Sequence, residues 1–113
     1  MSNNLSKKPV ILHVTWTLKP GTGEKFLEIF KPVAEKIAAE KECRYLNVFQ
    51  DIRDENIFKI VQIWDADATW ISTTLSARDY YPPFFEAMKE IAVKHRESNA
   101  LLAVDGFNLV KPT

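Results

Sequence analysis

Apolar residues occupy both faces of a predicted strand that runs from Asn56 to Trp64. Side chains alternate along a strand, so every second residue shares a face. One face carries Phe58, Ile60 and Trp64, and the other carries Ile57, Val61 and Ile63. A strand of this kind needs cover on both sides of its sheet.

The spacing of apolar residues defines the other predicted elements. Alternation predicts strands over residues 10–18 and 44–50, and a last strand within residues 104–110. Helical spacing predicts one helix from residue 22 to about 41, a second from residue 66 or 67, and a third from residue 84 to 95. Pro82 and Pro83 separate the last two helices. The order β-α-β-β-α-(α)-β predicts an α+β, ferredoxin-like fold with an antiparallel sheet.

The helices of this fold cover only one face of the sheet. The second face carries Ile11, Val61 and Ile63, which would form a sizeable apolar patch in water. Face-to-face association of two copies would bury this patch. We therefore expect a homodimer at micromolar concentration.

Length and composition favour a single small soluble domain. With 113 residues, the chain is expected to form one domain over residues 9–113 after a flexible N-terminus of residues 1–8. Lys and Arg number 15 and so do Asp and Glu, which argues against nucleic acid or an anionic membrane as a partner. An apolar run long enough for a signal sequence or a membrane span is missing from the sequence, so we expect a cytoplasmic protein. The single cysteine and the scattered histidines predict no metal site.

Several short motifs, taken in order, resemble the antibiotic biosynthesis monooxygenase family. They are Lys19-Pro20-Gly21, then Glu24 and Phe26, then Glu40 closely followed by Cys43, then Gln62-Ile63-Trp64 before an Asp-Ala-Asp-Ala-Thr-Trp helix start. The resemblance covers roughly residues 9 to 95, and Tyr80-Tyr81-Pro82 is similar to fungal members. It implies a dimeric α+β barrel with a pocket between helices and sheet. It also implies either cofactor-independent oxidation in polyketide secondary metabolism or haem degradation.

The chain departs from the best-defined active sites of that family. Haem-degrading relatives use Asn, Trp and His where this chain has Val14, Trp64 and Thr74, so haem degradation is disfavoured. The quinone-forming relatives have an Asn and an Arg near the positions of Ile60 and Phe84. The resemblance therefore implies a pocket without transferring a known catalytic set.

The candidate site lies on the helix-facing side of the sheet. Gln62 is the polar residue of an apolar face and could hold a carbonyl or phenol oxygen of the substrate. Trp64 and Trp16 could stack on an aromatic substrate, although both are also suited to the core. His95 shares the predicted stripe of the third helix and is the candidate base, although a cation also suits a helix C-terminus. Further predicted lining residues are Val14, Trp70, Thr74, Tyr80, Tyr81 and Phe85.

Three functions remain open from the sequence. The first is a cofactor-free monooxygenase-like oxidation of an aromatic or polyketide-like small molecule, a phenol or anthrone, with Gln62, Trp64 and His95 at the site. The second is a polyketide cyclase, dehydratase or decarboxylase that uses His13 or His95. His13, however, is one residue out of the register expected for that group, which would turn its side chain to the opposite face. The third is a non-catalytic ligand-binding barrel.

Overall fold

The computed structural model describes residues 8–109, 111 and 112. The elements are β1 (Val10–Thr17), α1 (Gly23–Ala39), β2 (Cys43–Gln50), β3 (Ile57–Trp64), α2 (Ala68–Thr73), the 3₁₀ helix η2 (Leu75–Ala77), α3 (Tyr81–Met88) and β4 (Glu97–Leu101). Apart from Lys8, the N-terminal segment that the sequence predicted to be flexible lies outside the described residues.

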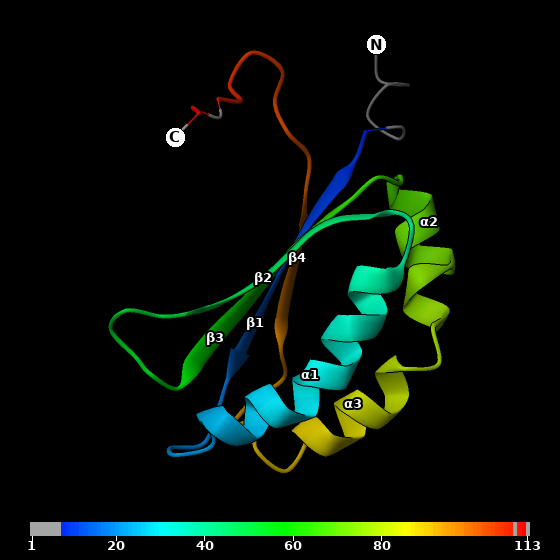
Figure 1. The fold of residues 1–113 in the computed structure, drawn as a ribbon. Helices are drawn as coiled ribbons and strands as arrows, with labels where there is room; N and C mark the ends of the chain where they lie inside the picture. Colours follow the sequence, from blue (N-terminus) through cyan, green and yellow to red (C-terminus); the bar gives the residue numbers. More distant parts are fainter. Residues whose placement is uncertain (1–7, 110, 113) are drawn as a thin grey trace.

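The four strands form one antiparallel sheet in the order β2-β3-β1-β4. All the helices lie on one side of this sheet (Figure 1). The predicted ferredoxin-like α+β fold is therefore confirmed. The hairpin loop between β2 and β3 falls at residues 51–56.

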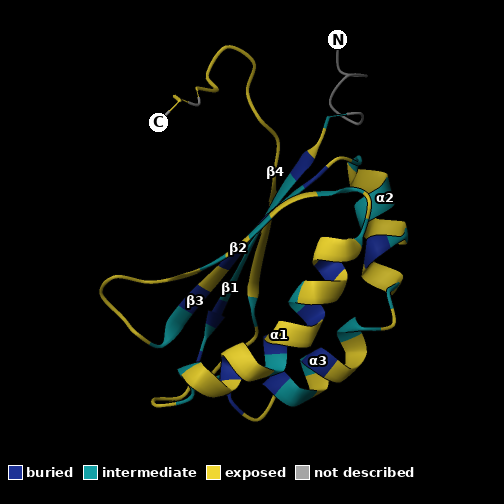
Figure 2. Cartoon of the chain, viewed as in Figure 1, coloured by how far each residue is buried: buried dark blue, intermediate teal, exposed yellow. Residues whose placement is uncertain are grey.

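The core lies between the helices and the sheet, and β3 shows this most directly. Its helix-facing side chains, Phe58, Ile60, Gln62 and Trp64, are all buried. The residues of the opposite face are partly buried or exposed in the single chain (Figure 2). Aromatic rings fill much of the core: Phe26 stacks on Phe30 with ring centres 5.8 Å apart. The two-faced pattern of β3 is therefore confirmed, with its second face uncovered by any described element.

The third helix ends earlier than the sequence predicted, at Met88 and not at residue 95. Helix α3 ends at Met88, and the chain then pairs with the end of β1: Leu18 bridges Ala92, and the Val93 amide donates to the Thr17 carbonyl at 2.9 Å. The apolar residue Ile91 is buried in the turn that follows α3, and not on a helix. His95 follows it, exposed to solvent and outside any helix or strand.

The last strand was predicted at the wrong place. It is β4, where Ile11 pairs with Leu101. Only one further residue of β1 lies beyond Ile11, so the chain after Leu101 has no strand edge to pair with. Residues 104–109 are exposed and include a turn at Gly106, whose φ is +86°. Val110, the end of the predicted strand, lies outside the described residues.

Candidate functional site

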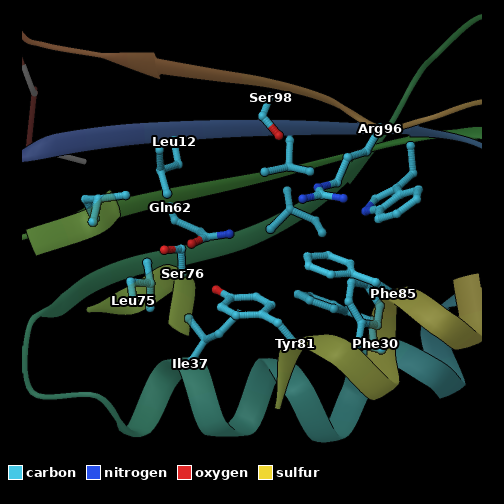
Figure 3. Close-up of a pocket in the computed structure, with 15 residues that line it drawn as sticks. Leu12, Phe30, Ile37, Gln62, Leu75, Ser76, Tyr81, Phe85, Arg96 and Ser98 are labelled. Carbon is cyan, nitrogen blue, oxygen red and sulfur yellow. The ribbon is translucent and has the colours of Figure 1, made fainter. Parts of the chain in front are cut away.

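The helix-facing side of the sheet is the floor of a pocket. Two cross-strand rows build this floor: Gln62 pairs with Leu12, and Ile60 pairs with Val14, which in turn pairs with Ser98. The walls come from α1, α2, η2 and α3, and Arg96 closes one end (Figure 3). The cavity measures about 290 Å³, near the lower end of the range for small-molecule sites.

Gln62 is the buried polar side chain of the floor. Its Oε1 accepts a hydrogen bond of 2.8 Å from the indole Nε1 of Trp64. This bond fixes the orientation of the amide, so its nitrogen end points into the pocket (Figure 3). Within the described residues, the amide nitrogen has no hydrogen-bond partner. The site therefore presents an oriented N–H donor to whatever the pocket contains.

The two tryptophans of the sheet have different roles. Trp64 is fully buried and contacts Trp70 with ring centres 5.7 Å apart, so it supports Gln62 from behind instead of lining the cavity. Trp16 does line the cavity, and it packs edge-on against Phe84 at 5.9 Å. The buried indole N–H of Trp16 has no hydrogen-bond partner among the described residues.

Arg96 brings a positive charge to an apolar wall. Its guanidinium lies 3.9 Å from the ring centre of Phe85 and 6.0 Å from that of Trp16. Burial lowers the pKa of this guanidinium, although the nearby Tyr81 acts in the opposite direction. Arginine nevertheless stays protonated in proteins, so the charge is present at neutral pH.

Tyr81 is the hydroxyl-bearing ring of the wall. It stacks on Phe85 with ring centres 5.5 Å apart. Burial raises the pKa of Tyr81 to about 12, so its hydroxyl keeps its proton and acts as a donor at neutral pH. The ring centre of Tyr80 lies 4.8 Å from that of Tyr81.

Tyr80 also belongs to a hydrogen-bonded cluster with Glu40 and Arg78. Arg78 donates to both carboxylate oxygens of Glu40, at 2.8 and 2.9 Å, and the Tyr80 hydroxyl donates to the same carboxylate at 2.8 Å. Burial alone raises the pKa of Glu40, but the hydrogen bonds from Arg78 and Tyr80 outweigh it and hold the pKa below its usual value. The cluster thereby ties the segment before α3 to the end of α1.

The model for the antibiotic biosynthesis monooxygenase family matches residues 9–72, which is more than half of the chain. A putative monooxygenase of Pestalotiopsis microspora is 31% identical over 88 residues, covering 78% of this chain and 73% of that protein. The chain belongs to the antibiotic biosynthesis monooxygenase family.

Solved structures show the same fold at low sequence identity. A putative antibiotic biosynthesis monooxygenase from Caulobacter crescentus is 19% identical, with a TM-score of 0.78 over 92% of this chain and 97% of that chain. A mutant of SnoaB, a cofactor-independent oxygenase from Streptomyces nogalater, is 15% identical, with a TM-score of 0.73 over 88% of this chain and 97% of that chain. The match to the family model ends at residue 72, before α3 and Arg96. In this protein, the pocket wall that α3 and Arg96 form therefore lies outside the region matched by the family model.

The structure brings together part of the predicted site. Five predicted residues line the cavity: Gln62, Trp16, Val14, Tyr81 and Phe85. Trp64, Trp70 and Tyr80 pack behind these residues, and Thr74 precedes η2 without lining the cavity. His13 pairs with Val61 and faces the helix-free side of the sheet, as expected.

Arg96 lines the pocket, and the predicted base His95 does not. His95 was placed at the pocket because the third helix was extended to it, and that helix ends at Met88. The exposed His95 does not line the cavity, whereas its neighbour Arg96 does. Sequence reasoning missed Arg96, as well as Ser76 and Ser98. The available signal was the run Lys94-His95-Arg96, which places two further cations beside the predicted base.

In the described part of the chain, no cluster of three His, Cys, Asp or Glu side chains is arranged to hold a metal ion. Among the same residues, no helix has the length and apolarity needed to cross a membrane.

Proposed function

We propose that this protein is a cofactor-independent enzyme that oxidises an aromatic, polyketide-like phenol or anthrone by a monooxygenase-type reaction. Membership of the antibiotic biosynthesis monooxygenase family supports the reaction type. The pocket supports the substrate class, because its walls are largely aromatic and aliphatic. The observation that carries the proposal is Gln62, whose amide N–H groups point into this apolar cavity.

The reaction needs no external reductant. An anthrone loses the two hydrogens of its central methylene and gains a carbonyl; one atom of dioxygen enters the product and the other leaves as water. The electrons come from the substrate, which reacts with dioxygen as its deprotonated enolate. The protein therefore has to bind a flat ring system and stabilise the enolate oxygen.

Gln62 is placed for the stabilising role. Its amide N–H can donate to the oxygen on which negative charge develops, and its orientation is already fixed by Trp64. The described residues that line the cavity include no carboxylate or imidazole, and Tyr81 is a donor at neutral pH. Deprotonation would thus depend on donors that lower the pKa of the substrate, with solvent accepting the proton.

Oxygen uptake tests this proposal. The protein is incubated with anthrone-type phenols in an oxygen electrode, and the quinone is measured by absorbance. Gln62→Leu should lower kcat on the order of 100-fold, as the loss of one preorganised donor does in other enzymes. Gln50→Leu makes the same change on the exposed edge strand β2 and should leave kcat unchanged.

Two outcomes would contradict the oxygenase. Turnover without oxygen consumption would indicate the cyclase, dehydratase or decarboxylase alternative. Tight binding of these phenols without any turnover would indicate a ligand-binding barrel. His13 and His95, on which the cyclase alternative depends, both lie away from the described cavity.

The proposed enzyme is also a homodimer that joins through the helix-free face of the sheet. An apolar row crosses all four strands on this face, because Tyr45 pairs with Ile63, Ile63 with Ile11, and Ile11 with Leu101. Tyr45 and Leu101 are 37% and 44% exposed in the single chain. The pocket lies on the opposite side of the sheet, so each subunit would carry its own site.

A further inference from the structure

Arg96 differs from the other arginines of the chain. Arg44 pairs with Asp65 and Arg78 with Glu40, while Arg53 lies exposed in the loop after β2. Arg96 is partly buried, and its guanidinium makes no salt bridge or hydrogen bond with residues 8–109, 111 or 112. A charge in an apolar wall is costly unless it is paired. This pocket therefore contains a cation that has no counter-ion among the described residues.

We propose that the pocket selects aromatic substrates that carry a carboxylate group, and that Arg96 is the residue that binds this group. The inference rests on the proposed function only in that it names the substrate class of the same pocket.

The surroundings of Arg96 suit this role. Phe85 lies against the guanidinium at 3.9 Å, and Trp16 lies near it at 6.0 Å. Aromatic rings hold the guanidinium by its flat face, which leaves its N–H edge available. That edge matches a carboxylate in a two-bond arrangement, which is the strongest common pairing of arginine.

The pocket has polar groups at two separate ends. Arg96 and Ser98 lie at one end, and Gln62 and Ser76 at the other (Figure 3). The floor between them is aliphatic, with Leu12 and Val14 among its residues. A flat aromatic acid would fit this division, with its carboxylate at Arg96 and a ring oxygen at Gln62.

The hydrogen-bonding groups of the cavity also favour an acceptor-rich ligand. The Gln62 amide, the Trp16 indole and the Arg96 guanidinium offer N–H donors that have no partner among the described residues. The cavity lining includes no carboxylate in that part of the chain. A neutral hydrocarbon would leave these donors unpaired, whereas an acid with a ring oxygen would pair with the donors of Arg96 and Gln62.

Binding of matched ligands tests the proposal. Naphthalene-2-carboxylate and naphthalene-2-carboxamide have nearly the same shape and differ in charge. In isothermal titration calorimetry with the full chain, the carboxylate should bind on the order of tenfold more tightly than the amide. Arg96→Gln should remove this preference while leaving amide affinity nearly unchanged, and Arg96→Lys should retain part of it. Arg53→Gln removes the same charge from an exposed loop and should have no effect.

A third ligand separates carboxylates from phenolates. If Arg96 is specific for a carboxylate, the affinity for 2-naphthol should not rise as its hydroxyl ionises at alkaline pH. A steep rise in affinity that is lost in Arg96→Gln would overturn that assignment. Equal affinity for acid and amide in the unchanged protein would also overturn it. If Arg96→Gln dissociates the dimer and leaves the ligand preference intact, Arg96 pairs with the second subunit and the proposal is wrong.

The test is independent of oxidation. Binding is measured without oxygen, so a carboxylate preference that depends on Arg96 can hold even if no anthrone is ever oxidised. Conversely, if Arg96→Gln lowers kcat equally for an anthrone acid and its methyl ester, Arg96 acts on the reacting enolate. In that case the oxygenase stands and the carboxylate site fails.

Discussion

At the scale of single residues, Gln62 and Trp64 form a unit in which each satisfies the other. The Trp64 indole N–H is buried and its acceptor is Gln62 Oε1 at 2.8 Å. The remaining amide N–H groups face the cavity. The polar side chain of Gln62 is therefore compatible with an apolar face: its oxygen is hydrogen-bonded to Trp64, and its N–H groups are available to a ligand.

A double-mutant cycle should detect this pairing. Gln62→Met keeps the side-chain size but leaves the Trp64 indole N–H without a partner, which should cost about 1–3 kcal/mol of unfolding free energy. Trp64→Phe leaves the Gln62 oxygen without its donor and opens a small cavity, because phenylalanine is smaller than tryptophan. The double variant should be less destabilised than the sum of the two single variants when measured by urea unfolding. Additive effects would show that the hydrogen bond contributes nothing to stability.

The sequence predicted the site best where a residue's position followed from a strand. Gln62, Trp16 and Val14 lie where alternation placed them, because a two-residue period leaves a side chain only two directions. His95 was misplaced because its position depended on how far a helix continued. Arg96 could not be recognised for the same reason. A helix that continued to residue 95 would place His95 at the pocket, but α3 ends at Met88, and Arg96, the residue after His95, lines the cavity.

At the scale of elements, the roof of the pocket is held by the Glu40 cluster. The segment from α2 to α3 contributes Leu75, Ser76 and Tyr81 to the cavity. Helix α2 has six residues and η2 three, too few to be stable alone. Glu40, at the end of α1, holds this segment through Arg78 and Tyr80.

The Glu40 cluster should give the roof a dependence on pH. The pKa of Glu40 in the folded protein lies below its usual value of 4.5. A carboxyl with a lowered pKa contributes stability that is present above the unfolded pKa and is lost as pH falls through the folded one. Glu40→Gln should therefore be less stable than the unchanged protein at pH 7, and the difference should shrink as the pH falls below about 4.5.

Hydrogen exchange locates this effect in the structure. In Glu40→Gln at pH 7, the amides of residues 74–81 should exchange faster, while those of β3 should keep their protection. Glu35→Gln, an exposed change on α1, is the matched control. A stability difference that stays constant with pH, or uniform exchange across the fold, would show that Glu40 does not act as a charged tether.

Element prediction was accurate for the first three strands and α1, and it failed after Met88. The early elements have strong periodic patterns or turn residues at their ends. After Met88, pairing with the end of β1 determines the conformation, through Leu18 with Ala92. Such a long-range contact leaves no periodic signal in the local sequence. The exposed strand β4 has no apolar alternation that could identify it.

At the scale of the whole molecule, the sheet divides the protein into a pocket side and a helix-free side. The row of Tyr45, Ile63, Ile11 and Leu101 is on the helix-free side, which is the proposed dimer interface, and the cavity is on the other. Because a twofold dimer uses the same patch in both copies, a change in this row acts twice. Association and ligand binding should therefore be separable by mutation.

Ile63→Lys tests this separation. The loss of an apolar side chain costs about 1.5–3 kcal/mol, and it is lost from both subunits, so the dimer should weaken by at least on the order of 100-fold. Light scattering should show a dimer for the unchanged protein at micromolar concentration and a monomer for the variant. Ile52→Lys makes the same change at a loop position that is 98% exposed, and it should stay dimeric.

The monomeric variant should still bind the naphthalene carboxylate, because the cavity is lined within one subunit. A monomer for the unchanged protein would rule out the dimer, and loss of binding in a folded monomeric variant would show that the pocket needs the second subunit.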